Sequence, residues 1–414
     1  MRTEQVDVAV VGGGPAGLAA ALSAKESGAE HVLLIERGER MGGILNQCIH
    51  DGFGTKLMGE AFTGPEYAQI FINRLTNTGV NVKLDTMVMD ISSDRELVIC
   101  SSDGLIRVKA GAIVLCTGCR ERTRGAIRIP GTRPAGVFTA GVVQEYMNIR
   151  NLSVGRKVVI LGSGDIGLIM ARRLTLEGVE VECVAEILPY PSGLARNIVQ
   201  CLEDFEIPLY LSTTVVDIHG IDRVEGITLA KIGPRGGIVR GTKRFVKCDT
   251  LLLSVGLIPE NELAKKAGIK LSPVTAGPIV DDHFQTSIPG IFCGGNALQV
   301  HDLVDYASME SEKAGRSAAF FAGAGKLPSP SIKVLPGQGI RYVIPHEVSG
   351  NEPVDFSMRV KSPEADRYIV FKQGEKVIRR MRQIELAPAA MIRMRVRSDR
   401  FQRSLDSLTV EVAD

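Results

Sequence analysis

The chain has 414 residues, of which 44% are hydrophobic and 23% are charged, and its formal net charge is +2. This length and composition suit a globular protein of two or three domains and exclude a disordered or fibrous chain. Because the net charge is close to zero, nothing in the overall charge attracts nucleic acid or a membrane surface.

Apolar segments in the chain are short. The longest, such as VDVAVVGGG and KVVILGSG, are interrupted by glycine, and no signal peptide precedes them. We therefore expect a cytoplasmic protein that is not an integral membrane protein. The eight cysteines are scattered along the chain, which is typical of reduced thiols, and they lack the close spacing of an iron–sulfur or structural zinc site. We expect no metal.

A strand, a glycine-rich turn, a helix and a second strand follow each other twice, in residues 6–38 and 156–187. Both copies carry Gly-x-Gly-x-x-Gly at the strand-to-helix turn, and in both an acid follows 24 residues after the first glycine. One such motif is weak evidence, but two with matched acids predict two dinucleotide-binding domains. The residues are Gly12, Gly14, Gly17 and Glu36 in the first copy and Gly162, Gly164, Gly167 and Glu186 in the second.

Each residue of this motif has a physical task. The first glycine makes a tight turn, the second lets a pyrophosphate approach the backbone, and the third lets the helix pack close to the strand. The phosphates then bind the free amides of the helix N-terminus. We expect Glu36 and Glu186 each to hold an adenosine ribose. An acid also repels a 2′-phosphate, and no Arg follows Glu186 in ILPYPSG, so the second site is predicted to prefer NAD over NADP.

Three further segments, GAIVLCTGCRER, DTLLLSVGLIPENELAKKAGIKL and TSIPGIFCGGNA, accompany the two turns. With them the chain resembles the flavoproteins that have two dinucleotide-binding domains, the superfamily of thioredoxin reductase and the pyridine nucleotide–disulfide oxidoreductases. The resemblance implies an α/β fold of two Rossmann-like three-layer domains, the NAD(H) domain inserted in the FAD domain. We expect the FAD domain in residues 1–122 and 285–326, the NAD(H) domain in 123–284 and a β-rich C-terminal domain in 327–414.

The resemblance also implies which residues contact the cofactors. Asn296 stands where the family has Asp in its second FAD fingerprint, and an amide can still donate and accept hydrogen bonds there. The helix that follows is expected to direct its N-terminus at the flavin ring, with one Asp of the His301, Asp302 and Asp305 cluster as its cap. The expected FAD residues are Gly12, Gly14, Pro15, Ala16, Gly17, Glu36, Arg37, Gly43, Thr117, Gly118, Gly295, Asn296, Asp302 and Val304; the expected NAD residues are Gly162, Gly164, Asp165, Ile166, Gly167, Glu186 and Gly256.

A narrower resemblance depends on GGILNQCIHDGFG, TGCRERTRG and GNALQVHDLVD. Together they are similar to the FAD/NAD subunit of multi-subunit glycerol-3-phosphate, proline, opine and hydroxyproline dehydrogenases. This implies companion subunits, a substrate-oxidising flavoprotein or an iron–sulfur subunit, and hydride transfer between NAD(H) and FAD. The alternatives are a free-standing NADH-dependent reductase or oxidase and a flavin-binding scaffold without catalysis.

Cys116 and Cys119 have the two-residue spacing of thiol–disulfide enzymes, but they lie at neither position where the superfamily places its redox disulfide. We interpret them as small side chains that fill a turn near FAD. Cys48 and His50 follow the Gly42-Gly43 pair, which in the superfamily passes under the flavin. Both are candidate catalytic residues beside the flavin, with a buried thiol and a hydrogen-bonded loop histidine as the alternative.

The last 88 residues have a Pro-rich beginning and short alternating segments, which predict a small β-rich domain. They contain 15 Lys and Arg against 11 Asp and Glu. Arg393, Arg395 and Arg397 alternate along one predicted strand. This face is either a docking surface for an acidic partner or a solvated edge whose charge prevents aggregation.

Overall fold

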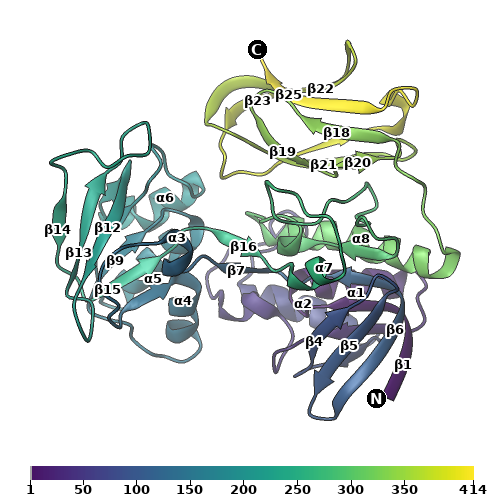
Figure 1. Ribbon diagram of the computed structural model, residues 1–414, viewed down its shortest axis with the longest axis horizontal. Coiled ribbons are helices and arrows are strands. Elements are labelled where there is room, and N and C mark those ends of the chain that lie inside the picture. The colour runs from purple at the N-terminus through teal and green to yellow at the C-terminus, as the bar shows by residue number, and fades with distance from the viewer. Residues whose placement is uncertain (1) are drawn as a thin grey trace. The chain divides into compact units, whose positions relative to one another are not determined.

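The computed structural model describes residues 2–414 (Figure 1), and the chain forms two compact units. The first unit consists of two segments of the chain, one that ends at Cys119 and one that begins at Pro259. The second unit is the segment between them, Arg120–Ile258. The chain passes between the units in strands β7 (Cys119–Glu121) and β16 (Leu257–Pro259), which pair in a two-stranded sheet. The second unit is therefore an insertion whose two ends are neighbouring strands.

The first unit contains a seven-stranded sheet in the order β3-β2-β1-β6-β5-β4, with β17 also paired to β6. Strands β1, β2, β3, β6 and β17 are parallel to one another, whereas β5 pairs antiparallel with β6 and β4 pairs antiparallel with β5. The elements are β1 (Arg2–Val11), α1 (Pro15–Glu26), β2 (Val32–Ile35), η1 (Gly43–Gln47), α2 (Gly64–Thr76), β3 (Asn81–Lys83), β4 (Met87–Ile91), β5 (Glu96–Ser101), β6 (Gly104–Leu115), α7 (Glu262–Lys266), β17 (Ile291–Cys293), η3 (Gly295–Ala297) and α8 (Val304–Ala324).

Two helices of small residues pack closely against each other and this sheet. In α1 every residue from Ala16 to Ala24 is buried, so the helix is enclosed on all sides, as its alanine-rich sequence permits. Its neighbour α8 approaches so closely that a Cβ atom at Gly315 would lie 2.1 Å from the carbonyl oxygen of Ala20. The later segment of the chain thus completes the core begun by the first.

The second unit is built around a five-stranded parallel sheet in the order β11-β10-β9-β15-β8. A separate three-stranded antiparallel sheet contains β12, β13 and β14. The elements are α3 (Arg124–Ile127), β8 (Val137–Thr139), α4 (Ala140–Asn148), β9 (Lys157–Leu161), α5 (Asp165–Leu176), β10 (Glu180–Ala185), α6 (Ala195–Cys201), η2 (Glu203–Phe205), β11 (Leu209–Tyr210), β12 (Thr213–His219), β13 (Gly226–Lys231), β14 (Arg244–Val246) and β15 (Thr250–Leu253).

The C-terminal residues form two β-sheets around an apolar core of their own. One sheet has the order β20-β18-β25-β22-β23 and the other the order β19-β21-β24. The elements are β18 (Ile332–Pro336), β19 (Ile340–Ile344), β20 (Glu347–Val348), β21 (Val354–Val360), β22 (Glu364–Gln373), β23 (Lys376–Leu386), β24 (Ile392–Val396), η4 (Ser398–Arg400) and β25 (Ser407–Ala413). The alternating apolar pattern of these strands predicts the inward and outward faces that they show.

The boundary of the second unit differs from the sequence-based expectation. The NAD(H) domain was expected to reach residue 284, but the contacts within the chain place the end of the second unit at Ile258. The reason is that Ala264, Ile269, Val280 and Phe284 are buried in the core of the first unit. The sequence suggested that this segment continues the NAD(H) domain because it follows that domain directly, whereas many residues that it packs against lie far away in the chain.

The β-rich C-terminal domain contacts the rest of the first unit through paired polar groups. The backbone amide and hydroxyl of Ser349 donate to Asp282 at 3.1 and 2.9 Å, and the amide of His346 donates to the carbonyl of Val280 at 2.9 Å. In return, the amide of Val280 donates to Nδ1 of His346 at 3.2 Å. These contacts explain why residues 327–414 do not separate as a unit of their own.

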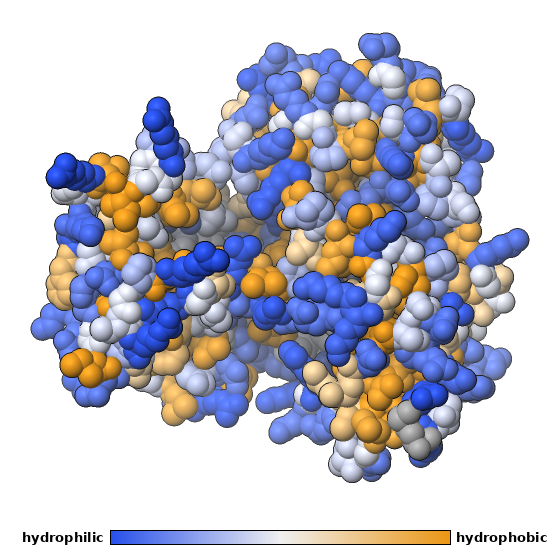
Figure 2. Space-filling view, viewed as in Figure 1, coloured by the Kyte–Doolittle hydropathy of each residue, from blue (hydrophilic) through white to orange (hydrophobic). Residues whose placement is uncertain are grey.

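Among residues 2–414, no helix is both long and apolar enough to cross a membrane. On the face shown in Figure 2, hydrophobic side chains are interspersed with charged ones.

The close packing of α1 and α8 generates a prediction about stability. Gly315→Ala should lower the free energy of unfolding by about 1–3 kcal/mol, because the new Cβ would collide with the Ala20 carbonyl and force the helices apart. Gly323→Ala on the same helix meets nothing within 4 Å and should leave the stability unchanged or slightly raised. Urea unfolding of both variants measures the difference. Equal losses in the two variants would contradict the assignment of this contact.

Candidate functional site

The first glycine-rich turn connects β1 to α1. Gly12 has φ +105°, and a Cβ there would lie 2.3 Å from the Cys116 carbonyl oxygen, so the turn fits tightly beside the end of β6. A Cβ at Gly17 would lie 1.7 Å from the Gly12 carbonyl oxygen. A Cβ at Gly14, in contrast, would meet only the Cα of Gly43, at 4.0 Å. The face of the turn at Gly14 is therefore open to a ligand, while the other two glycines are needed for packing.

The N-terminus of α1 meets the requirements of an anion site. Gly14 is its N-cap and has no side chain to accept from the first amides, and Pro15 starts the helix. No acidic residue lies in the first turn. The helix dipole and its unpaired amides thus favour a phosphate at Gly14.

Glu36 joins the end of β2 to the turn. Its carboxylate accepts from the amide of Gly13 at 2.6 Å and from the amide of Gly38 at 2.7 Å. A carboxylate has about four acceptor positions, so lone pairs remain for a further donor. The side chain is half-buried, so a ligand can reach them. Arg37, the next residue, is exposed. This arrangement leaves Glu36 able to accept from ribose hydroxyls.

Two later segments reach the same turn. Gly43, with φ +54°, lies against Gly14, since a Cβ on Gly43 would be 2.9 Å from the Gly14 Cα. Gly295 in η3 lies against Ala16, where its Cβ would be 2.6 Å from the Ala16 Cβ. Residues that are almost 280 positions apart in the chain therefore surround the start of α1.

Asn296 is held by two neighbours. Its Nδ2 donates to Cys119 Sγ at 3.5 Å, and its Oδ1 accepts from the His301 amide at 3.0 Å. The Nδ1 atom of His301 is 3.3 Å from the same Oδ1. The amide that replaces the expected Asp thus orders the loop before α8.

A buried ion pair lies directly behind Asn296. Nε2 of His301 is 3.4 Å from the Glu310 carboxylate, and both side chains are almost fully buried. Glu310 also accepts from the Gly295 amide at 2.9 Å and from Gln299 Nε2 at 2.6 Å. These contacts of His301 and Glu310 therefore support the loop of residues 295–301.

The start of α8 corrects the expected helix cap. The N-cap residue is Leu303, and no side chain caps the helix. Asp305 instead accepts from the amides of Gly54, Lys56 and Leu57 at 3.2, 3.2 and 2.8 Å. A carboxylate that is fully buried binds the free amides of a neighbouring loop in preference to those of its own helix.

Asp302 and Val304 flank this cap position. Oδ2 of Asp302 accepts from the Met391 amide in the C-terminal domain at 3.0 Å, and Oδ1 lies 3.8 Å from Arg359. Val304 is the first residue of α8 and is half-buried. Asp302 was expected to contact FAD, but its carboxylate connects the loop to the β-rich domain.

Thr117 and Gly118 tie the end of β6 to the returning chain. The Thr117 hydroxyl donates to the Glu260 carbonyl at 2.6 Å, and the Glu260 amide donates to the Gly118 carbonyl at 2.9 Å. Cys116 is buried beneath the glycine-rich turn, and its burial raises the pKa of the thiol to about 12. These contacts agree with a packing role for the turn that contains Cys116 and Cys119.

Cys48 lies at the end of η1, close to α2. Its thiol donates to the Ile44 carbonyl at 3.3 Å, and burial raises its pKa to about 12. His50 is half-buried and stacks at a tilt on Phe53, with 5.0 Å between the ring centroids. Because the thiolate is the reactive form of cysteine, this environment suppresses nucleophilic chemistry at Cys48 near neutral pH.

The second unit repeats the glycine-rich turn between β9 and α5. A Cβ at Gly162 would lie 2.0 Å from the Ser254 carbonyl oxygen, and one at Gly167 would lie 2.7 Å from Ser254 Cβ. Gly164 is less confined, with Ser254 Oγ at 3.4 Å from its missing Cβ. Gly164 also caps α5 without a side chain. The turn is thus built from glycines in the same way as the first, although Asp165 places an acidic residue in the first turn of α5.

Glu186 is more enclosed than Glu36. It is 3% exposed and accepts from the Ser163 amide at 3.0 Å, the Ser163 hydroxyl at 2.6 Å, the Ser192 hydroxyl at 2.7 Å and the Leu188 amide at 2.9 Å. A carboxylate offers about four acceptor positions. A ribose hydroxyl could therefore bond Glu186 only by displacing one of these donors.

Of the remaining expected NAD residues, one is held by hydrogen bonds within the chain and the others are at least partly exposed. Asp165 Oδ1 accepts from the Leu194 amide at 2.8 Å and from Asn197 Nδ2 at 2.6 Å, which fixes the start of α6. Ile166 is half-buried in the first turn of α5, and Gly256 is exposed with φ +96° after β15. Asp165 therefore positions a neighbouring helix from beside the phosphate site.

Sequence reasoning missed Glu310, Ile187 and Ser192. Glu310 lies in the helix at the spacing of the buried Ala307 and Ala314, and this spacing is the signal that could have found it. Ile187 is 53% exposed directly after Glu186, an apolar side chain at the position that follows the ribose acid. No sequence pattern could have predicted that Ser192 reaches back to Glu186.

The residues fit the two cofactors. Each glycine-rich turn has one open glycine at the N-terminus of a helix without a side-chain cap. In each unit the strand after this helix is followed directly by an acid. Within residues 2–414, no group of three or more His, Cys, Asp or Glu residues is arranged to hold a metal ion.

Comparisons with known proteins extend this picture. The chain is 26% identical to an opine oxidase subunit of Agrobacterium tumefaciens over 92% of its own length and 79% of that relative. It is 28% identical to the NADPH glutamate synthase small chain of Escherichia coli over 74% of its length, and to the ferredoxin reductase component of a Cupriavidus chlorobenzene dioxygenase over 60%. The match covers 66% and 60% of these last two relatives.

Solved structures agree on the fold. Thioredoxin reductase of T. acidophilum superposes with a TM-score of 0.62 at 22% identity, over 77% of this chain and 98% of that one. The family model for pyridine nucleotide-disulphide oxidoreductases matches residues 6–311, about three quarters of the chain. The chain therefore belongs to the pyridine nucleotide-disulphide oxidoreductase family and is an oxidoreductase with FAD and NAD(P)H as its cofactors.

Proposed function

We propose that the chain transfers hydride between NAD(H) and bound FAD as the NADH-linked subunit of a multi-subunit dehydrogenase that acts on glycerol-3-phosphate, an amino acid or an opine. The observation that carries this proposal is the pair of open glycine-rich turns, one in each unit. The likeness to the opine oxidase subunit over 92% of the chain supports the assignment to a component of this type.

The residues of the first unit are proposed to hold FAD. Gly14 and the amides of α1 bind the pyrophosphate, Glu36 accepts from the ribose, and Gly43 and Gly295 close the two sides of the turn. Asn296 and the buried pair of His301 and Glu310 hold the loop at the start of α8 in place. When bound, FAD supplies the ring that takes up hydride and passes on electrons.

The residues of the second unit are proposed to select NAD(H). Gly164 and the start of α5 bind the pyrophosphate, while Glu186 repels a 2′-phosphate at the end of β10. The side chains that follow, Ile187 and Leu188, are exposed and apolar and suit the face of an adenine ring. Hydride transfer needs alignment but no acid or base, so a side chain such as Cys48 is not required for chemistry.

Two other functions receive less support. A free-standing reductase or oxidase that uses Cys48 needs a thiolate, and burial raises the pKa of this thiol to about 12. A non-catalytic flavin scaffold would have no use for the second glycine-rich turn, which is as tightly built as the first.

The decisive experiment is anaerobic mixing of the FAD-loaded protein with NADH. We expect rapid loss of flavin absorbance at about 450 nm with NADH and much slower loss with NADPH. Each chain should take up two electrons. Gly167→Ala should abolish the reaction with NADH without loss of bound FAD, because its Cβ would clash with Ser254 in the second unit only. The control is Gly237→Ala in the same unit, where a Cβ meets nothing within 4 Å. Loss of FAD from Gly167→Ala would contradict the assignment of the two turns.

Cofactor preference is predicted to depend on the residue after Glu186. Ile187→Arg places a guanidinium where it can bind a 2′-phosphate, so the ratio of kcat/KM for NADPH to that for NADH should rise at least about ten-fold, or ~1.4 kcal/mol. Ile221→Arg adds the same charge at a position that is 85% exposed in the same unit and should leave the ratio unchanged. An unchanged ratio in Ile187→Arg would show that β10 does not end at the ribose.

The thiols provide a test of the alternative that uses Cys48. Labelling of the native protein with Ellman's reagent near neutral pH should give the same number of rapidly reacting thiols in wild type and Cys48→Ser, because Cys48 is buried and protonated. Cys100 is only half-buried, so Cys100→Ser should lose one rapidly reacting thiol. A rapidly reacting Cys48 would instead favour a reductase or oxidase that uses this residue.

A further inference from the structure

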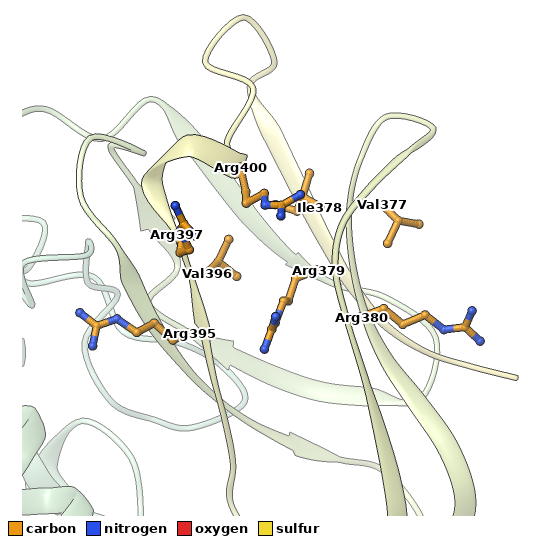
Figure 3. Close-up of a pocket in the computed structure, with 8 residues that line it drawn as sticks. All are labelled: Val377, Ile378, Arg379, Arg380, Arg395, Val396, Arg397 and Arg400. Atoms are coloured by element: carbon orange, nitrogen blue, oxygen red, sulfur yellow. The ribbon is translucent and has the colours of Figure 1, made fainter.

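A pocket of about 310 Å³ lies on the C-terminal β-rich domain (Figure 3). No carboxylate is among the residues that line it. We call it the arginine pocket, and it is lined by Arg379, Arg380, Arg395, Arg397 and Arg400 together with Val377, Ile378 and Val396. Five arginines beside aliphatic side chains favour an anion that also carries apolar groups.

The arginine pocket lies where two sheets end. Strand β23 is the last strand of the five-stranded sheet, and β24 is the last strand of the three-stranded sheet. A terminal strand has backbone amides and carbonyls that no ladder partner satisfies on one side, so it can accept a further strand. The pocket residues come from these two strands and the η4 turn that follows.

Acidic neighbours compensate only part of this charge. Arg395 lies 3.9 Å from Asp355, and Arg397 lies 3.2 Å from Asp399. Arg380 donates to the Asp414 carbonyl at 2.8 Å and covers the ring of Tyr368 at 3.6 Å. Within residues 2–414, no acidic group lies within ion-pair distance of the two others, Arg379 and Arg400.

The directions of the side chains separate these two groups. In Figure 3, Arg380 and Arg395 point to opposite sides, away from each other, whereas Arg379 lies between the two strands. Arg379 and Arg400 are both exposed, and they leave positive charge without an acidic partner at the concave surface of the pocket. An anionic ligand would neutralise this charge.

Strand β23 also exposes apolar side chains. Val377, which lines the pocket, is 48% exposed, and Ile384, farther along the strand, is 84% exposed. If the arginines served only to keep the edge from aggregating, exposed aliphatic side chains on the same strand would work against that purpose. Charge together with apolar surface along an open edge suits a strand that carries both acidic and aliphatic residues.

Part of the predicted basic face is used within the chain. Arg393 donates to Met309 Sδ at 3.4 Å and covers the Tyr306 ring at 4.8 Å, so it belongs to the contact with α8. This corrects the expectation that Arg393, Arg395 and Arg397 act as one outward face. The outward charge is centred on Arg379 and Arg400, which sequence alternation alone did not indicate.

We propose that β23 and the arginine pocket bind an extended acidic segment of a companion subunit, which adds a strand to this edge and places its carboxylates against Arg379 and Arg400. The identity of the partner rests on the proposed function, since that function requires a companion chain. A second copy of this chain does not suit the site, because its own edge would bring the same positive charge.

The test uses the FAD-loaded full chain and a fluorescein-labelled peptide of four Glu-Val repeats, followed by fluorescence anisotropy. We expect saturable binding that weakens at least about ten-fold between about 0.05 and 0.5 M NaCl. The double variant Arg379→Glu with Arg400→Glu should lose at least about ten-fold in affinity. The matched control reverses two exposed residues outside the pocket and should bind as wild type does. They are Arg341 in β19, the opposite terminal strand of the smaller sheet, and Lys361, which follows β21.

Strand addition is tested separately from charge. In an extended peptide, alternate amides point to the same side. N-methylation of all valines or of all glutamates should therefore abolish binding in one of the two peptides and spare it in the other. Equal binding by both methylated peptides, or by the double variant and wild type, would overturn the proposal.

The result is independent of the proposed function because flavin reduction is measured on the same samples. The double variant should keep its FAD and its rate of reduction by NADH, which also shows that it is folded. If the wild type is reduced normally by NADH but does not bind the peptide, the proposed binding at the arginine pocket is refuted and the proposed function is not. Normal peptide binding without reduction by NADH would refute the proposed function alone.

Discussion

The structure depends on close approach of backbone to backbone at the two glycine-rich turns. In the first unit, Gly17 packs on the carbonyl of Gly12, which in turn faces Cys116 at the end of β6. The second unit repeats this with Gly167, Gly162 and Ser254. Because no side chain fits between these atoms, the helix begins at the strand and presents its amides to one open position. The same backbone contact therefore closes the core of each unit and forms its candidate binding site.

Local patterns were sufficient to predict most of the fold. The two βαβ repeats, the strand ends at Glu36 and Glu186 and the β-rich C-terminal segment all follow from periodicity and turn residues that are close in sequence. The boundary of the second unit could not be predicted in this way. Residues 259–284 pack on a core that includes the strands and helices of residues 8–116, far earlier in the chain, and no local signal encodes that choice.

The acidic side chains show the same limit at the candidate site. The sequence indicated acids at Glu36, Glu186, Asp302 and Asp305, but not which donors they would meet. Asp305 binds a loop some 250 positions away, and Asp302 binds the C-terminal domain. Glu186 fills its acceptors with two serines and two backbone amides. A buried carboxylate bonds whichever donors the tertiary fold provides, so its role depends on contacts that spacing cannot specify.

The insertion of the second unit has a consequence for the order in which the chain folds during synthesis. The second unit is continuous, so all of its strands have been made once Ile258 leaves the ribosome. The first unit still lacks β17, which pairs with β6, and α8, which covers α1. Until residue 324 has been synthesised, the apolar surface of α1 that Gly315 and its neighbours cover has no partner within the chain. The unit that begins the protein is thus completed after the unit that interrupts it, and it is exposed to chaperones and misfolding for longer.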